Sequence, residues 1–181
     1  LMVDEAHASG LLGTTGAGLA ELQQVKGRIP ILMGTLGKAL GSFGAFVACE
    51  QILREELLNT CRGFIFSTAL PPPSVGASLA ALRIAQSERW RSAKALAQAA
   101  SLREALGLPE ATSAIVPIQI GTDAEAVTVA LALQEQGFDV RPIRPPTVPE
   151  GTARLRITTG AHLEEHQLEA LIRALKGQVR P

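Results

Sequence analysis

Short apolar runs separated by glycine-rich loops make up the first part of the chain. Residues 1–3 are apolar and stop at Asp4, a second run begins at Ile31, and a third covers residues 43–50. Runs of this length predict strands, and the glycines between them predict tight turns. With a short helix expected over residues 19–25, this alternation is typical of an α/β sheet.

The rest of the chain predicts a long helix and then a second unit. A further strand is expected over residues 60–68. Prolines at 71–73 then introduce an Ala- and Leu-rich stretch that predicts one long helix over residues 74–106, with a kinked helix as the alternative. Gly107 and Pro109 end it. Beyond it we expect strands at 113–121, 138–143 and 153–158, a helix capped by Asp123 that runs to about Gln136, and a helix at 163–176. The predicted domains are residues 1–108 and 109–181.

Composition excludes several classes of protein. Seventeen basic and 17 acidic residues give a formal net charge of zero, and aromatic residues make up only 3% of the chain, so neither charge nor stacking favours a nucleic-acid partner. No apolar run approaches the ~20 residues of a membrane span. Two cysteines, Cys49 and Cys61, predict neither a disulfide framework nor a metal site. We therefore expect a cytoplasmic protein without metal.

The opening "VDEAH" also matches the magnesium-binding box of a DEAH-type helicase. Such a box works with a phosphate-binding loop, and the only candidate surrounds Lys38 in "ILMGTLGKA". There Leu32 stands where that loop needs glycine, and Ala39 stands where it needs a hydroxyl group. The pattern therefore argues strongly against a helicase.

Asp4 and Lys38 favour a different chemistry. Asp4 ends a strand, where open α/β sheets bind ligands, and Lys38 lies in an apolar, glycine-rich loop. Burial favours a neutral lysine amine, which can form a Schiff base with an aldehyde. Enzymes that use pyridoxal 5'-phosphate need such a lysine and a carboxylate for the pyridine nitrogen. His7 could then bind the phenolic oxygen and Thr35 the phosphate, although a surface lysine, a strand-end cap, a loop histidine and a turn-capping threonine remain alternatives.

Four segments together resemble the α-oxoamine synthase family of pyridoxal phosphate enzymes. They are "VDEAHASGLLGTTGAG", "GTLGKALGSFGAF", "GFIFSTALPP" and "IRPPTVPEGTARLRIT", and the resemblance runs along nearly the whole chain. It implies fold type I: a large domain with a mostly parallel sheet, and a small C-terminal α/β domain. It also implies that this sequence is the C-terminal half of a chain that works as a homodimer.

The resemblance assigns roles to individual residues. Lys38 would carry the Schiff base and move the substrate proton, Asp4 and His7 would bind the cofactor ring, and Thr35 its phosphate. Ser67 and Thr68 would reach the phosphate in the partner subunit, or simply cap the following helix. Thr147 would contact the substrate. Arg156 would pair with its carboxylate, with Arg154 as the alternative.

The resemblance also implies a reaction, the decarboxylative Claisen condensation of an amino acid with an acyl thioester. The segment "RPPTVPEGTARLR" favours L-alanine and a pimeloyl group on CoA or a carrier protein, in biotin biosynthesis. Glycine C-acetyltransferase, 5-aminolevulinate synthase and serine palmitoyltransferase types are alternatives within the family. We expect these 181 residues alone to be inactive in the condensation. A fragment that does not bind the cofactor at all is the alternative outside the family.

Overall fold

The computed structural model describes residues 1–178 and divides into two compact units. The first runs from Leu1 to Ser92, and the second begins at Ala93. Within the described residues, no helix has both the length and the apolar character that a bilayer crossing requires.

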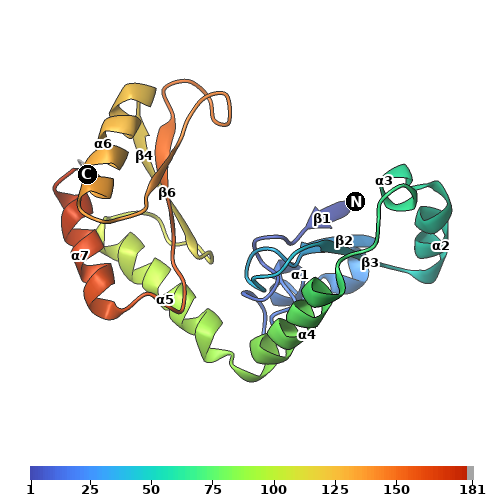
Figure 1. Ribbon diagram of the computed structural model, residues 1–181. Helices are drawn as coiled ribbons and strands as arrows, with labels where there is room; N and C mark the ends of the chain where they lie inside the picture. The colour runs from blue at the N-terminus through green and yellow to red at the C-terminus, as the bar shows by residue number, and fades with distance from the viewer. Residues whose placement is uncertain (179–181) are drawn as a thin grey trace. The chain divides into compact units, whose positions relative to one another are not determined.

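A three-stranded sheet forms the centre of the first unit (Figure 1). Its strands are β1 (Met2–Asp4), β2 (Ile31–Thr35) and β3 (Ala45–Cys49), in that order. β1 and β2 are parallel, with Asp4 beside Met33, whereas β3 runs antiparallel to β2. These three predicted strands are confirmed. Because β1 and β2 are parallel, their carboxyl ends meet at the same edge of the sheet.

Five helical segments complete the first unit: α1 (Leu19–Leu22), the 3-10 turn η1 (Lys26–Arg28), α2 (Gln51–Thr60), α3 (Arg62–Ile65) and α4 (Pro72–Ser87). The strand predicted over residues 60–68 is wrong, because the amides of Ile65 and Phe66 donate to the carbonyls of Cys61 and Arg62, four residues earlier, at 3.0 and 3.1 Å. A short apolar run does not by itself separate helix from strand. Helix α2 was not predicted.

The long helix predicted over residues 74–106 is two helices. α4 ends at Ser87, Glu88 adopts non-helical dihedrals (φ −114°, ψ 55°), and α5 covers Trp90–Ala105. Neither glycine nor proline stands at the break, so the sequence carried none of the usual signals for it.

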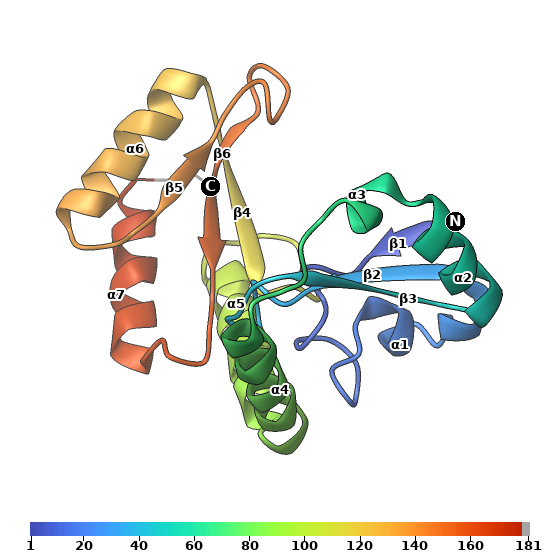
Figure 2. The same ribbon diagram turned by 45° about the vertical axis from the view of Figure 1, so that its right-hand side comes forward.

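An antiparallel sheet and three helices form the second unit. The strands β4 (Ile115–Gly121), β5 (Arg141–Ile143) and β6 (Ala153–Thr158) lie in the order β4-β6-β5. Helices α6 (Asp123–Glu135) and α7 (Glu165–Lys176) lie on one side of the sheet (Figures 1 and 2). The strands and the two helices predicted in this part are confirmed, except that Thr122, rather than Asp123, is the N-cap of α6.

Helix α5 contributes to the core of the second unit. Ala99 and Leu102 are fully buried in that core. The buried guanidinium of Arg103 donates to the carbonyls of Ser113 and Ile115 at 2.9 and 2.6 Å, and the hydroxyl of Thr159 donates to Ala95 at 2.7 Å. The domain division near residue 108 stays a prediction, but α5 packs with the strands and helices C-terminal to it.

The two units differ in how well they bury their apolar side chains. Among the described residues, every large apolar side chain that is strongly exposed belongs to the first unit, except Leu131. The buried apolar residues of the first unit are few and mostly small: Ala6, Ala8, Leu12, Ala20 and Leu40. The first unit therefore leaves apolar surface open, whereas the second encloses a core of its own.

Candidate functional site

The carboxyl ends of β1 and β2 bring a carboxylate and a hydroxyl group to one edge of the sheet. Asp4 is the last residue of β1, and its Oδ1 accepts the amide of Ala6 at 2.7 Å. Thr35 is the last residue of β2; its hydroxyl donates to the carbonyl of Gly44 at 3.1 Å and accepts the amide of Gly37 at 3.3 Å. Ligands bind outside the carboxyl ends of strands in open α/β sheets.

His7 lies in the turn after Asp4. The amides of Ala8 and Ser9 donate to the carbonyl of Glu5 at 2.9 and 2.8 Å, which closes this turn. The side chain of His7 is exposed. Asp4 and His7 are therefore presented by one short, hydrogen-bonded turn at the end of β1.

Lys38 lies in the loop that joins β2 to β3. The amide of Leu36 donates to Gly44 and that of Ser42 to Leu36, at 2.9 and 2.8 Å, so the base of the loop is closed. The burial expected for Lys38 is not found in this chain, where its side chain is exposed. The buried member of the loop is Leu40, which points into the small core and leaves the lysine outside.

The turn after Asp4 and the loop of Lys38 lie in direct contact at Gly10. Its φ is +81°, and a Cβ built there would lie 3.0 Å from the Cβ of Ala39. Only glycine adopts such a dihedral at little cost, and any side chain would press on the residue next to Lys38. The first unit thus holds Asp4 and Thr35 at the ends of two adjacent strands, and His7 and Lys38 on the loops that follow these strands and meet.

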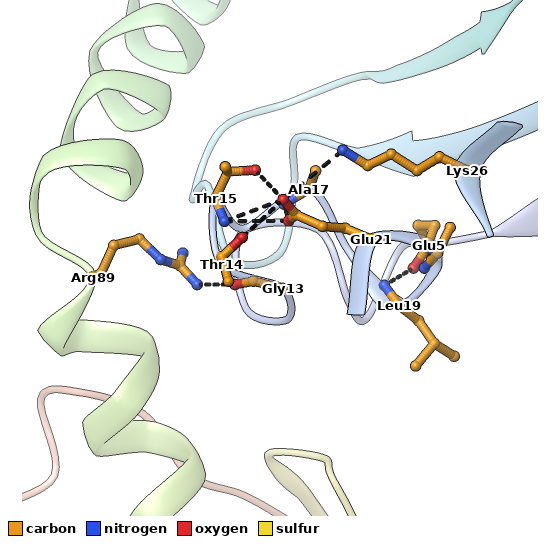
Figure 3. A network of polar contacts seen from close by, with 10 residues as sticks. Glu5, Gly13, Thr14, Thr15, Ala17, Leu19, Glu21, Lys26 and Arg89 are labelled. Carbon is orange, nitrogen blue, oxygen red and sulfur yellow. Dashed lines mark hydrogen bonds and ion pairs between the residues drawn. The ribbon is translucent and has the colours of Figure 1, made fainter. Parts of the chain in front are cut away.

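Two acidic side chains hold the glycine-rich loop of residues 10–18, as Figure 3 shows. The buried carboxylate of Glu5 accepts the amides of Leu19 and Ala20 at 2.8 and 2.7 Å. Glu21 accepts the hydroxyl of Thr15 at 2.8 Å and the amide of Ala17 at 3.0 Å. The pKa of Glu21 lies below its ordinary value, and the largest cause is the hydrogen bond from the Thr15 hydroxyl. The backbone amides of this loop and the charge of Lys26 lower this pKa further. Glu5 was missed from sequence because its partners, the amides of Leu19 and Ala20, lie 14 and 15 residues away along the chain.

Ser67 and Thr68 lie after α3 and are exposed. The hydroxyl of Ser67 donates to the carbonyl of Gly63 in α3. This bond explains the local position of Ser67, and the contact of both residues with a partner subunit's cofactor stays a prediction.

Arg156 and Thr147, the expected substrate contacts, belong to the second unit. Arg154 and Arg156 share the face of β6 opposite to the buried Leu155 and Ile157, as the alternation of a strand requires. Arg154 is half-buried and donates to the carbonyl and hydroxyl of Thr152 at 3.0 and 3.1 Å, whereas Arg156 is exposed. Of the two, Arg156 is the more accessible to an anion.

Thr147 lies in the proline-rich loop between β5 and β6. Its side chain is exposed, and its amide donates to the carbonyl of Arg144 at 3.0 Å. Throughout residues 1–178 the structure has no group of three or more His, Cys, Asp or Glu residues that could hold a metal ion.

Comparison with known proteins places this arrangement in a family. The sequence profile described as aminotransferase class I and II matches residues 1–175. The 8-amino-7-oxononanoate synthases of Anaeromyxobacter dehalogenans and Cellvibrio japonicus are 49% and 47% identical to the chain, over 97% of its length in both cases. The chain spans 45% and 46% of these relatives, which is less than half of their length.

Solved structures show the same fold. A serine palmitoyltransferase from S. paucimobilis, solved with a bound PLP–myriocin aldimine, aligns with a TM-score of 0.91 at 28% identity, over 98% of this chain and 46% of that one. The 8-amino-7-oxononanoate synthase of Francisella tularensis aligns with a TM-score of 0.82 at 28% identity, over 98% and 54%. These neighbours confirm the predicted fold class and the resemblance to α-oxoamine synthases. Because the family profile covers nearly every residue, the chain belongs to the class I and II aminotransferase family.

Proposed function

We propose that this protein is a pyridoxal phosphate-dependent acyltransferase that condenses L-alanine with a pimeloyl thioester, with loss of carbon dioxide, to give 8-amino-7-oxononanoate for biotin biosynthesis. The observation that carries the proposal is the placement of Asp4 and Thr35 at the carboxyl ends of β1 and β2, with His7 and Lys38 on the two touching loops that follow these strands. Relatives named 8-amino-7-oxononanoate synthase, 44–49% identical over nearly the whole chain, support the choice of substrates.

The groups at this edge suit pyridoxal phosphate. An amine, a carboxylate and a hydroxyl match its aldehyde, its ring nitrogen and its phosphate. Gly41 in the loop of Lys38 has nothing within 4 Å of an added Cβ, so the loop faces open space at this position. The hydroxyl of Thr35 donates to Gly44 in this structure, so it must rotate to donate to a phosphate. The bound cofactor would supply an electron sink for the negative charge at the substrate α-carbon.

Each residue of the site would then have its own task. The exposed Lys38 reaches the α-carbon of the amino acid, removes its proton and later returns one to the product. Asp4, oriented by the amide of Ala6, holds a proton on the ring nitrogen, and His7 donates to the ring oxygen. Arg156 binds the amino-acid carboxylate, and Thr147 contacts the substrate.

The same family contains enzymes with other substrates, and the comparisons favour one of them. The curated relatives that are 44–49% identical are named 8-amino-7-oxononanoate synthase, whereas the solved serine palmitoyltransferases are 28–30% identical, as is the solved 8-amino-7-oxononanoate synthase at 28%. In the proposed enzyme, Ser67 and Thr68 serve the phosphate of the partner subunit of a homodimer in the cytoplasm. The cosubstrates are small molecules, with the acyl group carried by CoA or by a carrier protein.

The proposal is tested at Lys38. The purified chain is mixed with pyridoxal phosphate, scanned between about 330 and 430 nm for lysine-linked cofactor, reduced with borohydride and digested. We expect the pyridoxyl group on the peptide that contains Lys38, and loss of the absorption band in Lys38→Ala. Labelling at Lys26 or Lys94 instead would contradict the assignment.

Turnover is tested separately, with L-alanine and pimeloyl-CoA or pimeloyl carrier protein as substrates. Release of carbon dioxide and formation of 8-amino-7-oxononanoate support the proposed reaction. Cofactor binding at Lys38 with turnover of glycine or serine in place of alanine would instead assign the chain to another α-oxoamine synthase type.

A further inference from the structure

Arg89, between α4 and α5, makes three hydrogen bonds to the glycine-rich loop that follows Asp4 and His7. Its Nη1 donates to the carbonyl of Gly10 at 3.3 Å, and its Nη2 to those of Leu11 and Gly13 at 3.3 and 2.9 Å. A further bond joins Nη1 to Ala85 in α4 at 3.5 Å. Figure 3 shows the guanidinium reaching toward Gly13. One side chain thus ties four backbone carbonyls together.

This contact needs a guanidinium group. Arginine offers five N–H donors in a fixed plane, so it can serve several carbonyls at once, whereas the ammonium of lysine is a compact group that cannot span them. The loop itself leaves little room, since a Cβ on Gly16 would lie 2.4 Å from Nη1 of Arg89. The absence of a side chain at Gly16 therefore leaves the space that the guanidinium of Arg89 occupies.

The loop that Arg89 holds is the one that touches the loop of Lys38. Gly10, whose carbonyl accepts from Arg89, is also the residue in contact with Ala39. Gly10, Ala39 and Arg89 all line one cavity of about 290 Å³. Apolar packing does not fill this space, and the hydrogen bond from Arg89 reaches Gly10 at its edge.

We propose that Arg89 is a positioning residue, which holds the turn carrying Asp4 and His7 against the loop carrying Lys38. It touches none of the reacting groups and acts through Gly10 and Ala39. The catalytic meaning of this contact rests on the proposed function, but the contact itself does not. Sequence offered no signal for Arg89, because it stands in a stretch that predicts an uninterrupted helix.

Amide hydrogen exchange of the whole 181-residue chain tests the contact without cofactor. The variants are Arg89→Ala and the milder Arg89→Lys, with Arg91→Ala as the control, because Arg91 pairs with Glu88 at 2.7 Å and makes no bond to the loop. We expect peptides covering residues 8–18 and 36–42 to exchange about ten-fold faster or more in Arg89→Ala, since several hydrogen bonds from a charged donor are lost. Arg89→Lys should give a smaller increase in both peptides.

Three results would overturn the proposal. One is unchanged exchange in residues 8–18. Another is faster exchange there with no change in residues 36–42, because Arg89 would then hold its own loop only. The third is a uniform increase throughout the first unit with a lower unfolding midpoint, which marks a purely structural role. Peptides from β4 report on the second unit and should not change.

A second readout links Arg89 to the cofactor. The pyridoxal phosphate concentration for half-maximal borohydride trapping at Lys38 should rise several-fold in Arg89→Ala and stay unchanged in Arg91→Ala. An equal value in Arg89→Ala and the unaltered chain would count against positioning. If the unaltered chain is not trapped at all, the proposed function fails, and the exchange result still decides the role of Arg89.

Discussion

Gly10 shows at the scale of single residues how closely the two loops of the candidate site approach each other. Gly10→Ala should destabilise the first unit for two reasons. The positive φ should cost alanine about 1–2 kcal/mol, and the close contact of the new Cβ with Ala39 should add about 1 kcal/mol or more. Gly41→Ala is the matched control, because its φ is +59° and an added Cβ meets nothing within 4 Å. Denaturant unfolding of both variants measures the difference. Equal losses would mean that the contact with Ala39 is unimportant.

Glu21 gives the glycine-rich loop a dependence on pH. The pKa of its carboxyl is lowered in the folded chain, and the largest cause is the hydroxyl of Thr15. The stability that Glu21 contributes to the folded state is therefore complete above the ordinary pKa of 4.5 and is lost as the pH falls through the folded pKa. An NMR titration should place the midpoint of the Glu21 carboxyl below 4.5, with the amides of Thr15 and Ala17 shifting at the same pH. Glu21→Gln should abolish these amide shifts. A Glu21 midpoint at or above 4.5 would contradict the network.

At the scale of elements, the start of α6 depends on a reciprocal pair of hydrogen bonds. The hydroxyl of Thr122 accepts the amide of Glu125 at 3.3 Å, and the Glu125 carboxylate accepts the amide of Thr122 at 3.1 Å. Thr122→Ala should therefore cost about 1 kcal/mol of stability in the second unit, as the loss of an N-cap does. Thr128→Ala, in the exposed interior of the same helix, should change stability far less. Denaturant unfolding midpoints of the two variants measure this difference, and equal midpoints would contradict the role of Thr122 as the N-cap.

At the scale of the whole molecule, the second unit should fold without the first if α5 is kept. The peptide 93–181 includes Leu102 and Arg103, whereas 109–181 lacks both. We expect 93–181 to unfold cooperatively and to resist proteases. The peptide 109–181 should be less stable by several kcal/mol, because the loss of Leu102 alone corresponds to about 2–5 kcal/mol. Equal stability of the two peptides would show that α5 is dispensable.

The first unit, in contrast, should associate with itself when it is separated from the second unit. Its exposed apolar side chains include Phe43, Phe46, Phe64 and Phe66, and β3 is an exposed edge strand. Surfaces and edges of this kind favour association. The peptide 1–92 should therefore sediment as oligomers or aggregate at concentrations where 93–181 is a monomer. A monomeric and stable 1–92 peptide would show that this apolar surface is tolerated in water.

The sequence by itself determined the α/β class, most strands and the family, because strand periodicity and motif spacing are local along the chain. Only the tertiary structure decided that α5 packs with the second unit, and that residues 62–65 are helical rather than extended. It also decided which side chains hold the site's loops. Arg89 lies 76 residues from Gly13, a separation that no local pattern bridges. Lys38 was recognisable from its neighbours in the sequence. Its exposure was not, because it follows from the burial of Leu40, rather than Lys38, in the core.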